Sequence, residues 1–311
     1  MIEPLIFTKK KRSYEVPASL APIADTHAHL LNFWSKDPVD VLARAAQAGD
    51  QLLITLLDPI ADGLDAPAFH DRLAGWLAAA KSQFADQNTE LFDNVRYLCG
   101  AHPYGAPDYT DAVHLQVEAA LDDPLCIGIG EIGLDYHFDH DDNVAPAPHN
   151  LQIKVMERQL DIAIRHNVPV ELHLRNDIGD EARVAHADAY SVLRNMGIPQ
   201  AGCVLHCFTE DRATAERFIE LGCHIAFGGA ATFKRNDGIR EAFAACPLDR
   251  ILFETDCPYM APEPLRGLEC EPAMIVFTVD ALARDRAERT GEDSQTIARA
   301  AWDNAKRLFA M

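Results

Sequence analysis

The chain is poor in positive charge and lacks any long apolar run. Its 311 residues include 28 lysines and arginines against 48 aspartates and glutamates, a formal net charge of −20. A strongly acidic protein repels a polyanion at long range, which argues against an extended grip on nucleic acid. No run of about 18 apolar residues occurs, so we expect no membrane-spanning segment.

Cysteine pairs and a secretory signal are also missing. The eight cysteines include no C-x-x-C pair, which argues against a structural zinc cluster. Several lie in apolar runs such as Leu125–Ile127, a pattern typical of reduced thiols in a cytoplasmic protein. No apolar stretch follows the basic run Lys9–Arg12, which argues against a signal peptide and favours a solvated tail.

Eight short apolar segments alternate with stretches of helical periodicity, and 48% of the residues are hydrophobic. This alternation predicts an α/β protein, a parallel (β/α)8 TIM barrel rather than an open sheet. The predicted strands lie near Ile23–Asp25, Leu52–Leu56, Val95–Gly100, Cys126–Gly130, Val170–His173, Cys203–His206, His224–Phe227 and Ile251–Glu254. The predicted helices are Asp40–Gln47, Phe69–Phe84, Leu151–His166, Thr214–Leu221, Pro272–Arg286 and Ser294–Phe309.

No linker, internal repeat or low-complexity tract divides the chain. We therefore expect an N-terminal extension (residues 1–20) followed by one barrel domain (residues 21–311). Two stretches have the character of insertions, namely residues 58–94, which are long for one crossover, and residues 135–148. The second is rich in Asp, His and Pro, and we expect a loop over the barrel mouth.

Metal-ligand residues follow five of the predicted strands. Because the C-terminal ends of barrel strands meet at one face, we expect their side chains to converge there. His27 and His29, two residues apart on a strand, point to the same side. Each residue alone has a structural explanation: a core histidine, an arginine partner for Glu131, or a turn cap for Asp256. Together they predict a centre for one or two divalent metals with an open position for water, typical of a metal-dependent hydrolase. The six residues are His27, His29, Glu131, His173, His206 and Asp256.

These motifs and their order resemble the TatD-type metal-dependent deoxyribonucleases of the amidohydrolase superfamily, from about Ile23 to Phe309. The matching stretches are Asp25-Thr26-His27-Ala28-His29, Gly100-Ala101-His102-Pro103, Gly130-Glu131-Ile132-Gly133-Leu134-Asp135, His173-Leu174-Arg175, His206-Cys207-Phe208-Thr209 and Glu254-Thr255-Asp256-Cys257-Pro258-Tyr259.

The resemblance implies that the six residues are metal ligands and that Glu131 bridges two metals. It also implies that Asp256 accepts the proton of the attacking water and that His102 contacts substrate. From its chemistry, Arg175 is a candidate to hold a phosphate by two parallel hydrogen bonds, although a structural arginine is an equal alternative. Asp135 and Glu254 are candidates to orient ligand histidines.

Four positions depart from the family pattern, and they leave the predicted metal ligands intact. They are Tyr104, Asn176, Glu210 and Cys270, where the family often carries His, Asp, Gly and Asn. Glu210 adds a negative charge near the mouth, so these departures bear on the substrate.

We therefore expect a phosphodiesterase that cleaves nucleic acid from an end and grips it weakly. The alternatives are an amide, ester or lactone hydrolase on the same barrel, and a metal-binding scaffold without catalysis. Many such hydrolases use a carboxylated lysine to bridge metals, but no lysine occurs between Lys81 and Lys154. A mixed histidine and carboxylate site accepts Zn, Mn, Mg, Ni or Co, so the metal stays open, as does the oligomeric state.

Overall fold

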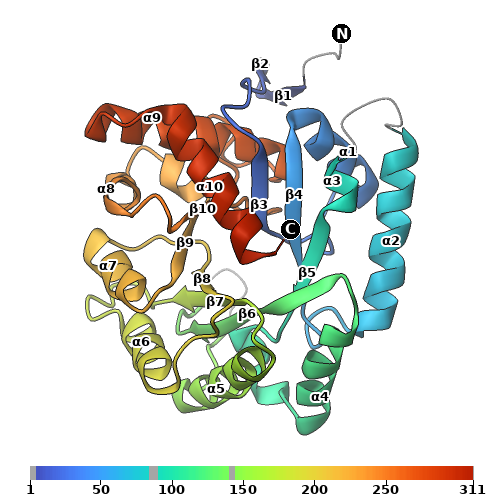
Figure 1. Cartoon of the computed structure of the whole chain (residues 1–311), viewed down its shortest axis with the longest axis vertical. Coiled ribbons are helices and arrows are strands. Elements are labelled where there is room, and N and C mark those ends of the chain that lie inside the picture. Colours follow the sequence, from blue (N-terminus) through green and yellow to red (C-terminus); the bar gives the residue numbers. More distant parts are fainter. Residues whose placement is uncertain (1–4, 84–89, 140–143, 311) are drawn as a thin grey trace.

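The computed structural model describes residues 5–83, 90–139 and 144–310. Eight parallel strands form one sheet in the order β10-β9-β8-β7-β6-β5-β4-β3, so each strand lies beside its neighbour in sequence. Helices surround the ring of strands (Figure 1). The predicted (β/α)8 barrel is confirmed.

The strands of the barrel match the predicted apolar segments within a few residues. They are β3 (Ile23–Ala28), β4 (Asp50–Leu57), β5 (Val95–Cys99), β6 (Cys126–Asp135), β7 (Val170–Arg175), β8 (Cys203–Leu205), β9 (His224–Phe227) and β10 (Ile251–Phe253). The helices are α1 (Pro38–Ala48), α2 (Ala66–Gln83), α3 (Glu90–Asp93), α4 (Asp111–Ala119), α5 (His149–His166), α6 (Val184–Met196), α7 (Arg212–Glu220), α8 (Asp237–Ala245), α9 (Ile275–Thr290) and α10 (Ser294–Leu308).

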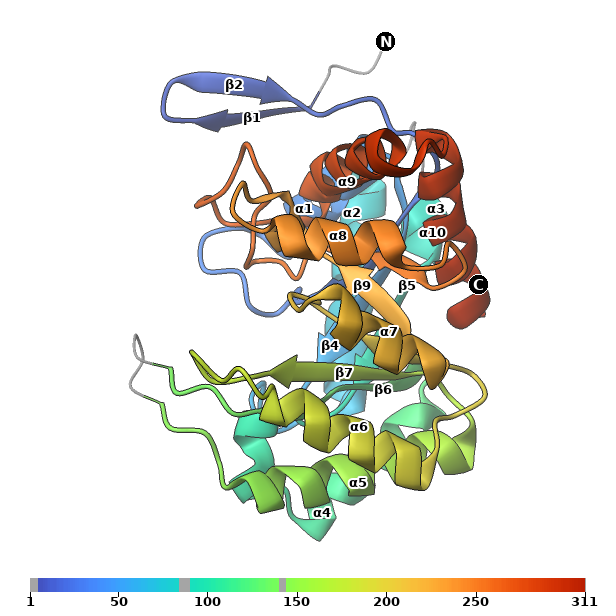
Figure 2. The ribbon, with the colours of Figure 1, turned by 90° about the vertical axis from the view of Figure 1, so that its left-hand side faces the viewer.

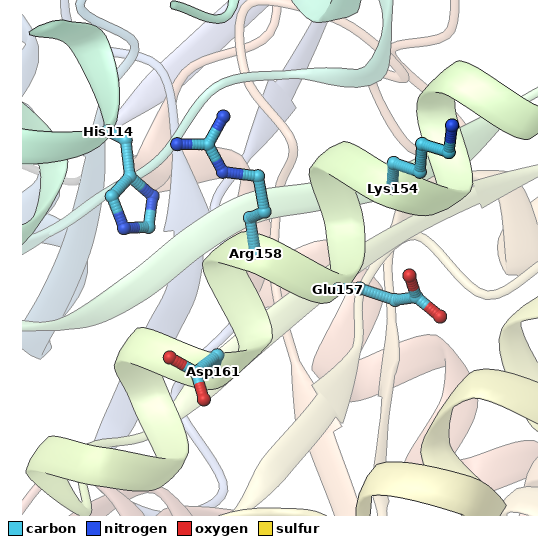
Figure 3. A pocket seen from close by; sticks show the side chains of 5 residues that line it. All are labelled: His114, Lys154, Glu157, Arg158 and Asp161. Atoms are coloured by element: carbon cyan, nitrogen blue, oxygen red, sulfur yellow. The ribbon is translucent and has the colours of Figure 1, made fainter. Parts of the chain in front are cut away.

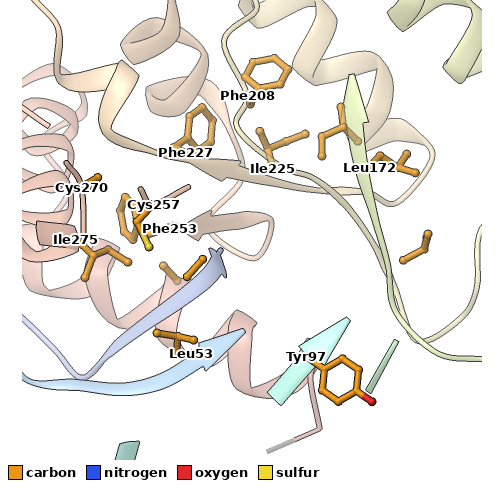
Figure 4. Close-up of a cluster of buried hydrophobic side chains, with 14 of the residues drawn as sticks. Leu53, Tyr97, Leu172, Phe208, Ile225, Phe227, Phe253, Cys257, Cys270 and Ile275 are labelled. Carbon is orange, nitrogen blue, oxygen red and sulfur yellow. The ribbon is translucent and has the colours of Figure 1, made fainter. Parts of the chain in front are cut away.

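Strand residues alternate between the inside and the outside of the barrel. On β4, Leu52, Ile54 and Leu56 belong to the inner apolar cluster, whereas Leu53 and Leu57 pack outward. Both faces are buried, which is why these strands read as continuous apolar runs. Figure 4 shows part of the outer layer. The inner cluster also contains residues at the end of α10, whose C-terminal end lies across the ring in Figure 1.

The first and last strands of the barrel meet and close the ring. His29 N donates to Cys257 O at 2.8 Å, and Asp256 N donates to His27 O at 2.9 Å. A parallel bridge also pairs Ala28 with Cys257. This closure brings the first and last motifs of the sequence side by side.

The N-terminal extension is not the solvated tail that the sequence predicted. It forms a hairpin of β1 (Ile6–Lys9) and β2 (Arg12–Glu15) in which Lys9 pairs with Arg12. Phe7 is buried against Phe277, with ring centroids 6.2 Å apart and edge to face. The alternation of exposed and buried residues along β1 gives the hairpin one apolar face, and that face docks on α9.

Four helices, α3, α4, α6 and α8, were not among the predicted ones, and the predicted Pro272–Arg286 helix begins as a short 3-10 turn. The insertion at residues 58–94 holds α2 and α3, although Phe84 at the end of the predicted helix lies outside the described residues. The same holds for residues 140–143 of the predicted mouth loop. No helix among the described residues is long and apolar enough to cross a membrane.

Candidate metal centre

The six predicted ligand side chains come together at one end of the barrel. Three of them lie within strands: His27 in β3, Glu131 in β6 and His173 in β7. The other three, His29, His206 and Asp256, follow the ends of β3, β8 and β10. The sequence predicted the ligands at the ends of strands, but β3, β6 and β7 run further than predicted, so His27, Glu131 and His173 lie within them.

Glu131 lies at the middle of this cluster. Its Oε1 is 3.0 Å from His173 Nδ1 and 3.0 Å from His206 Nε2. Its Oε2 is 3.7 Å from His29 Nε2 and 3.9 Å from His27 Nε2. The two oxygens of one carboxylate thus face two different pairs of histidines.

Asp256 completes the first of these two groups. Its Oδ1 is 3.4 Å from His29 Nε2 and 3.8 Å from His27 Nε2. The Nε2 atoms of His27 and His29 are themselves 3.0 Å apart. Four groups of side chains among the described residues bring their donor atoms close enough to hold a cation, and two of them share Glu131. These two are His27, His29 and Glu131, and Glu131, His173 and His206; the others are His27, His206 and Glu254, and His102, Asp135 and His173.

Burial and mutual contact set the charges of the cluster. Burial acts to raise the pKa of Glu131, but the charge of His206 and hydrogen bonds with His173 and His206 hold that pKa well below its usual range. Burial likewise opposes ionisation of Asp256, whose pKa is lowered by its hydrogen bond with His29. Burial acts to lower the pKa of His29, but Asp256 and Glu131 raise it to about 9. The carboxylates are therefore ionised and surrounded by nitrogen donors, a donor set that fits divalent metals.

Carboxylates behind the cluster hold two of the histidines in orientation. Glu171 Oε1 is 2.5 Å from His27 Nδ1, on the side of the ring away from Glu131. Asp135 Oδ2 is 2.9 Å from His173 Nε2. Such contacts fix the tautomer of a metal-binding histidine and raise its basicity.

Glu254 acts differently from what the sequence suggested. Its Oε1 accepts a hydrogen bond from the backbone N–H of Cys207, while His206 Nδ1 is 3.9 Å away. The buried His206 Nδ1 has no hydrogen-bond partner among the described residues. Glu254 therefore holds the backbone next to His206 and does not orient the imidazole ring of His206.

The two predicted substrate contacts both lie near His173 and Asp135. His102 Nε2 is 3.9 Å from Glu131 Oε1, and its ring lies 4.4 Å from that of His173, edge to face. Its backbone N–H donates to Asp58 Oδ2 at 2.9 Å. Arg175 ends β7 with a half-exposed side chain, and its Nη1 is 3.9 Å from Asp135 Oδ2. Arg175 is therefore placed to meet a ligand from solvent, whereas His102 belongs to the cluster itself.

A family model for TatD-related DNases matches residues 24–310 of the chain. The chain belongs to the TatD family. YcfH of Escherichia coli K12, an uncharacterized metal-dependent hydrolase, is 35% identical over 294 residues, covering 92% of this chain and 95% of YcfH. YabD of Bacillus subtilis, also an uncharacterized metal-dependent hydrolase, is 29% identical, covering 92% of this chain and 98% of YabD.

A solved structure agrees with these relatives. The crystal structure of YJJV, a TatD homolog from Escherichia coli K12, matches with a TM-score of 0.71 and 27% identity, covering 93% of this chain and 98% of YJJV. The protein is therefore a metal-dependent hydrolase of the TatD family.

Two departures from the TatD pattern contact one another. Asn176 Nδ2 donates to Glu210 Oε1 at 3.0 Å, and Arg183 Nε donates to Glu210 Oε2 at 2.6 Å. The negative charge that Glu210 brings to the mouth is thus balanced by Arg183. Glu210 therefore adds less unpaired negative charge here than the sequence suggested.

Sequence patterns gave Glu171 no role. It lies in the predicted strand Val170–His173, and its side chain is fully buried. A lone carboxylate in a buried strand needs a partner, and that rule was the available signal. Asp25 was also left without a role; its side chain accepts hydrogen bonds from Thr255 N at 2.9 Å and Thr255 Oγ1 at 2.6 Å, linking β3 to the segment after β10.

A hollow elsewhere on the surface lies between α4 and α5 (Figure 3). Its lining is charged, but Arg158 binds Asp111 at 2.8 Å, with its guanidinium over the ring of Tyr109. These contacts join α4 to α5, so they explain the charges as structural. The residues that line it are His114, Lys154, Glu157, Arg158 and Asp161.

Proposed function

We propose that this TatD-family hydrolase is a phosphodiesterase that cleaves nucleic acid, most readily DNA, from a strand end. The metal ligands in this proposal are His27, His29, Glu131, His173, His206 and Asp256. Glu131 and Asp256 are the catalytic carboxylates, and His102 and Arg175 contact the substrate.

The position of Glu131 carries the proposal. One carboxylate faces two histidine pairs through separate oxygens, at 3.0 Å on one side and 3.7 to 3.9 Å on the other. This arrangement suits two adjacent cations that share a bridging ligand. Paired divalent metals, when bound, supply a nucleophilic water at neutral pH and neutralise charge on the phosphoryl oxygens.

The chain's own groups then have separate tasks. Asp256 is ionised and lies beside His29, where it can accept the proton of a water aligned with the phosphorus. Arg175 offers two parallel N–H groups to a phosphate oxygen pair at the mouth. Glu171 and Asp135 keep His27 and His173 turned toward the centre.

The net charge of −20 supports action at an end rather than along a duplex, because affinity for nucleic acid comes largely from cations that neutralise phosphates. We also propose a cytoplasmic location. It is supported by the eight cysteines, all within the described residues, which are free thiols and mostly buried.

The test compares a labelled linear single strand of DNA with the same sequence closed into a circle. Protein with measured metal content should shorten the linear strand stepwise and leave the circle intact. Chelator-treated protein is the control, and activity should return when Mn, Mg, Zn, Ni or Co is restored. Efficient cutting of the circle would contradict action from an end.

The same preparation should be offered a lactone, an ester and a dipeptide. Turnover of one of these without any nucleic-acid cleavage would replace the proposal by the alternative hydrolase. Stoichiometric metal without turnover of any substrate would favour the non-catalytic scaffold.

A further inference from the structure

Cations that are far apart in the sequence meet along one edge of the barrel mouth. We name this edge the cationic rim and define it by seven residues: Lys9, Lys10, Lys11, Arg12, Lys234, Arg235 and Arg266. They stand on three segments: the β1–β2 hairpin, the stretch after β9, and the loop between β10 and α9.

Contacts between the segments hold the rim together. Lys9 Nζ donates to Pro264 O at 2.9 Å, which ties the hairpin to the loop that starts at Asp256. In that loop, the guanidinium of Arg266 lies 4.2 Å from the ring centre of Phe233, next to Lys234. Glu263 N donates to Thr232 Oγ1 at 2.8 Å, a second link between the same two segments.

The rim lies on the side of the barrel where the metal centre is. Figure 2 shows the hairpin turn on the side toward which β7 points, above the loops between β10 and α9. The loop in contact with Lys9 leads back to Asp256, a member of the centre. The rim and the metal centre therefore share one segment of the chain, the loop between β10 and α9.

The cations of the rim make no ion pairs among the described residues. By contrast, Lys36 and Arg183, elsewhere in the chain, are bound to Glu271 and Glu210. The three segments contain six carboxylates, but Glu254, Asp256, Glu269 and Glu271 are buried. Glu15 and Glu263 are therefore the carboxylates left at the surface of these segments against the seven cations, whereas acids outnumber bases 48 to 28 in the whole chain. This local excess of positive charge is the reverse of the overall balance, and it fits a polyanion.

The hairpin turn has lysines at two positions whose backbone conformation favours other residue types. Lys10 and Lys11 both have positive φ, 52° and 73°, in a two-residue turn. Glycine and asparagine are favoured in such a turn because side chains crowd the left-handed conformation. The side chains of Lys10, Lys11 and Arg12 are exposed, so packing does not account for them.

We propose that the cationic rim binds the phosphate backbone of a single nucleic-acid strand a few nucleotides from the phosphate at the metal centre. This proposal rests on the proposed function for the identity of the strand. The hairpin precedes residues 24–310, the part of the chain that the TatD family model matches.

The test uses a triple variant, Lys10→Ala, Lys11→Ala and Arg12→Ala, which leaves the Lys9 contact in place. The matched control is Lys154→Ala, Arg194→Ala and Arg299→Ala, three exposed cations on outer helices. Each variant loses three positive charges, so the net charge goes from −20 to −23 in both. Binding of a labelled oligo(dT) is measured by anisotropy over a range of salt, in an Asp256→Asn background that keeps the oligonucleotide whole.

The hairpin variant should bind oligo(dT) about 10- to 100-fold more weakly at low salt, and its salt slope should shrink by about 2, or ~0.7 for each lost phosphate contact. The control should match the parent. In the active background, kcat/KM for methyl p-nitrophenyl phosphate, which is too small to span the mouth, should be unchanged. An equal loss of oligo(dT) affinity in both variants, or no loss in the hairpin variant, would contradict the proposed role of the cationic rim.

Vesicles of phosphatidylserine separate the rim from a membrane contact. Hairpin-dependent binding to vesicles without binding to oligo(dT) would overturn the proposal. If the protein binds oligo(dT) through the hairpin but cleaves no nucleic acid, the proposed role of the cationic rim stands. The proposed function as a phosphodiesterase would then be wrong.

Discussion

Glu171 and His27 form a buried pair across the barrel, with Glu171 Oε1 2.5 Å from His27 Nδ1. Both side chains are fully buried. A histidine that binds a metal through Nε2 carries its proton on Nδ1 and donates it to the acceptor behind the ring. Glu171 is that acceptor, and its free Oε2 has no other partner among the described residues.

Replacing Glu171 by Gln should weaken metal binding at the His27 side of the centre. Gln keeps the shape but replaces the carboxyl group that faces His27 Nδ1 by an amide, which is a weaker acceptor. Such outer contacts typically change metal affinity or activity about 10- to 100-fold. Titration of metal-free protein against a chromophoric chelator gives the affinity. Glu157→Gln, on α5 away from the centre, is the control, and an unchanged affinity in Glu171→Gln would reject the role.

Asp135 offers the corresponding test on the other side. Its Oδ2 is 2.9 Å from His173 Nε2, so His173 faces Glu131 through Nδ1. Asp135→Asn should weaken the second metal equivalent, again about 10- to 100-fold, while the first equivalent binds as before. Metal titrations of Glu171→Gln and Asp135→Asn are compared. They show whether the two variants lose affinity for different metal equivalents. If both variants lost the same equivalent, the assignment of two groups that share Glu131 would be wrong.

The barrel could be read from the sequence because its physical signal is local. A strand covered on both faces is a run of apolar residues, as in Leu52–Leu57, and the carboxyl ends of such strands meet at one face. The outer helix α4 escaped because Val117 is its only fully buried position among nine residues, so it has little apolar periodicity.

The contacts behind the histidines and the cationic rim could not be read in this way. Glu171 meets His27 across a separation of 144 residues, and Lys9 meets Pro264 across 255. No periodicity or spacing reports a pair of that kind, because the fold alone sets it. In the sequence, Lys9–Arg12 and Lys234–Arg235 are separate short clusters, whereas the fold brings the segments that carry them together through the loop of Pro264 and Arg266.

His224 predicts how stability depends on pH. It begins β9, is buried, and neither ring nitrogen has a hydrogen-bond partner among the described residues. Burial and the charges of Arg250 and Arg307 lower its pKa from 6.5 to about 4. The folded state therefore holds this ring neutral, while the unfolded chain takes up a proton below pH 6.5. The contribution of His224 to the free energy of unfolding is therefore fully present above pH 6.5. It is lost as the pH falls from 6.5 toward about 4, because the unfolded chain then binds a proton that the folded chain does not.

His224→Leu should remove this part of the acid sensitivity. The free energy of unfolding, measured with urea, should fall less in the variant than in the parent between pH 6.5 and 4. The difference should be no more than about 3 kcal/mol, the value of a shift of this size. Both proteins are measured with chelator so that metal release does not contribute. The exposed His149→Gln should follow the parent, and equal pH profiles for His224→Leu and the parent would contradict the prediction.

Asp256→Asn tests the proposed base with little change in structure. The residue has φ 56°, a conformation that Asn tolerates better than most residues, and its backbone N–H donates to His27 O at the barrel closure. Asn keeps that bond but cannot accept a proton at neutral pH. Turnover of the linear strand should fall ~10² to 10⁴-fold, as expected for loss of a positioned base.

Because Asp256 is also a proposed ligand, turnover must be expressed per bound metal, at metal concentrations that saturate the variant. Asp62→Asn removes a neighbouring carboxylate that affects His29 through its charge alone, and it should change the rate only slightly. Thermal unfolding confirms that both variants are folded. If metal-saturated Asp256→Asn turned over as fast as the parent, Asp256 would be a ligand or a structural residue at most, and the proton of the attacking water would have to pass to another group of the centre.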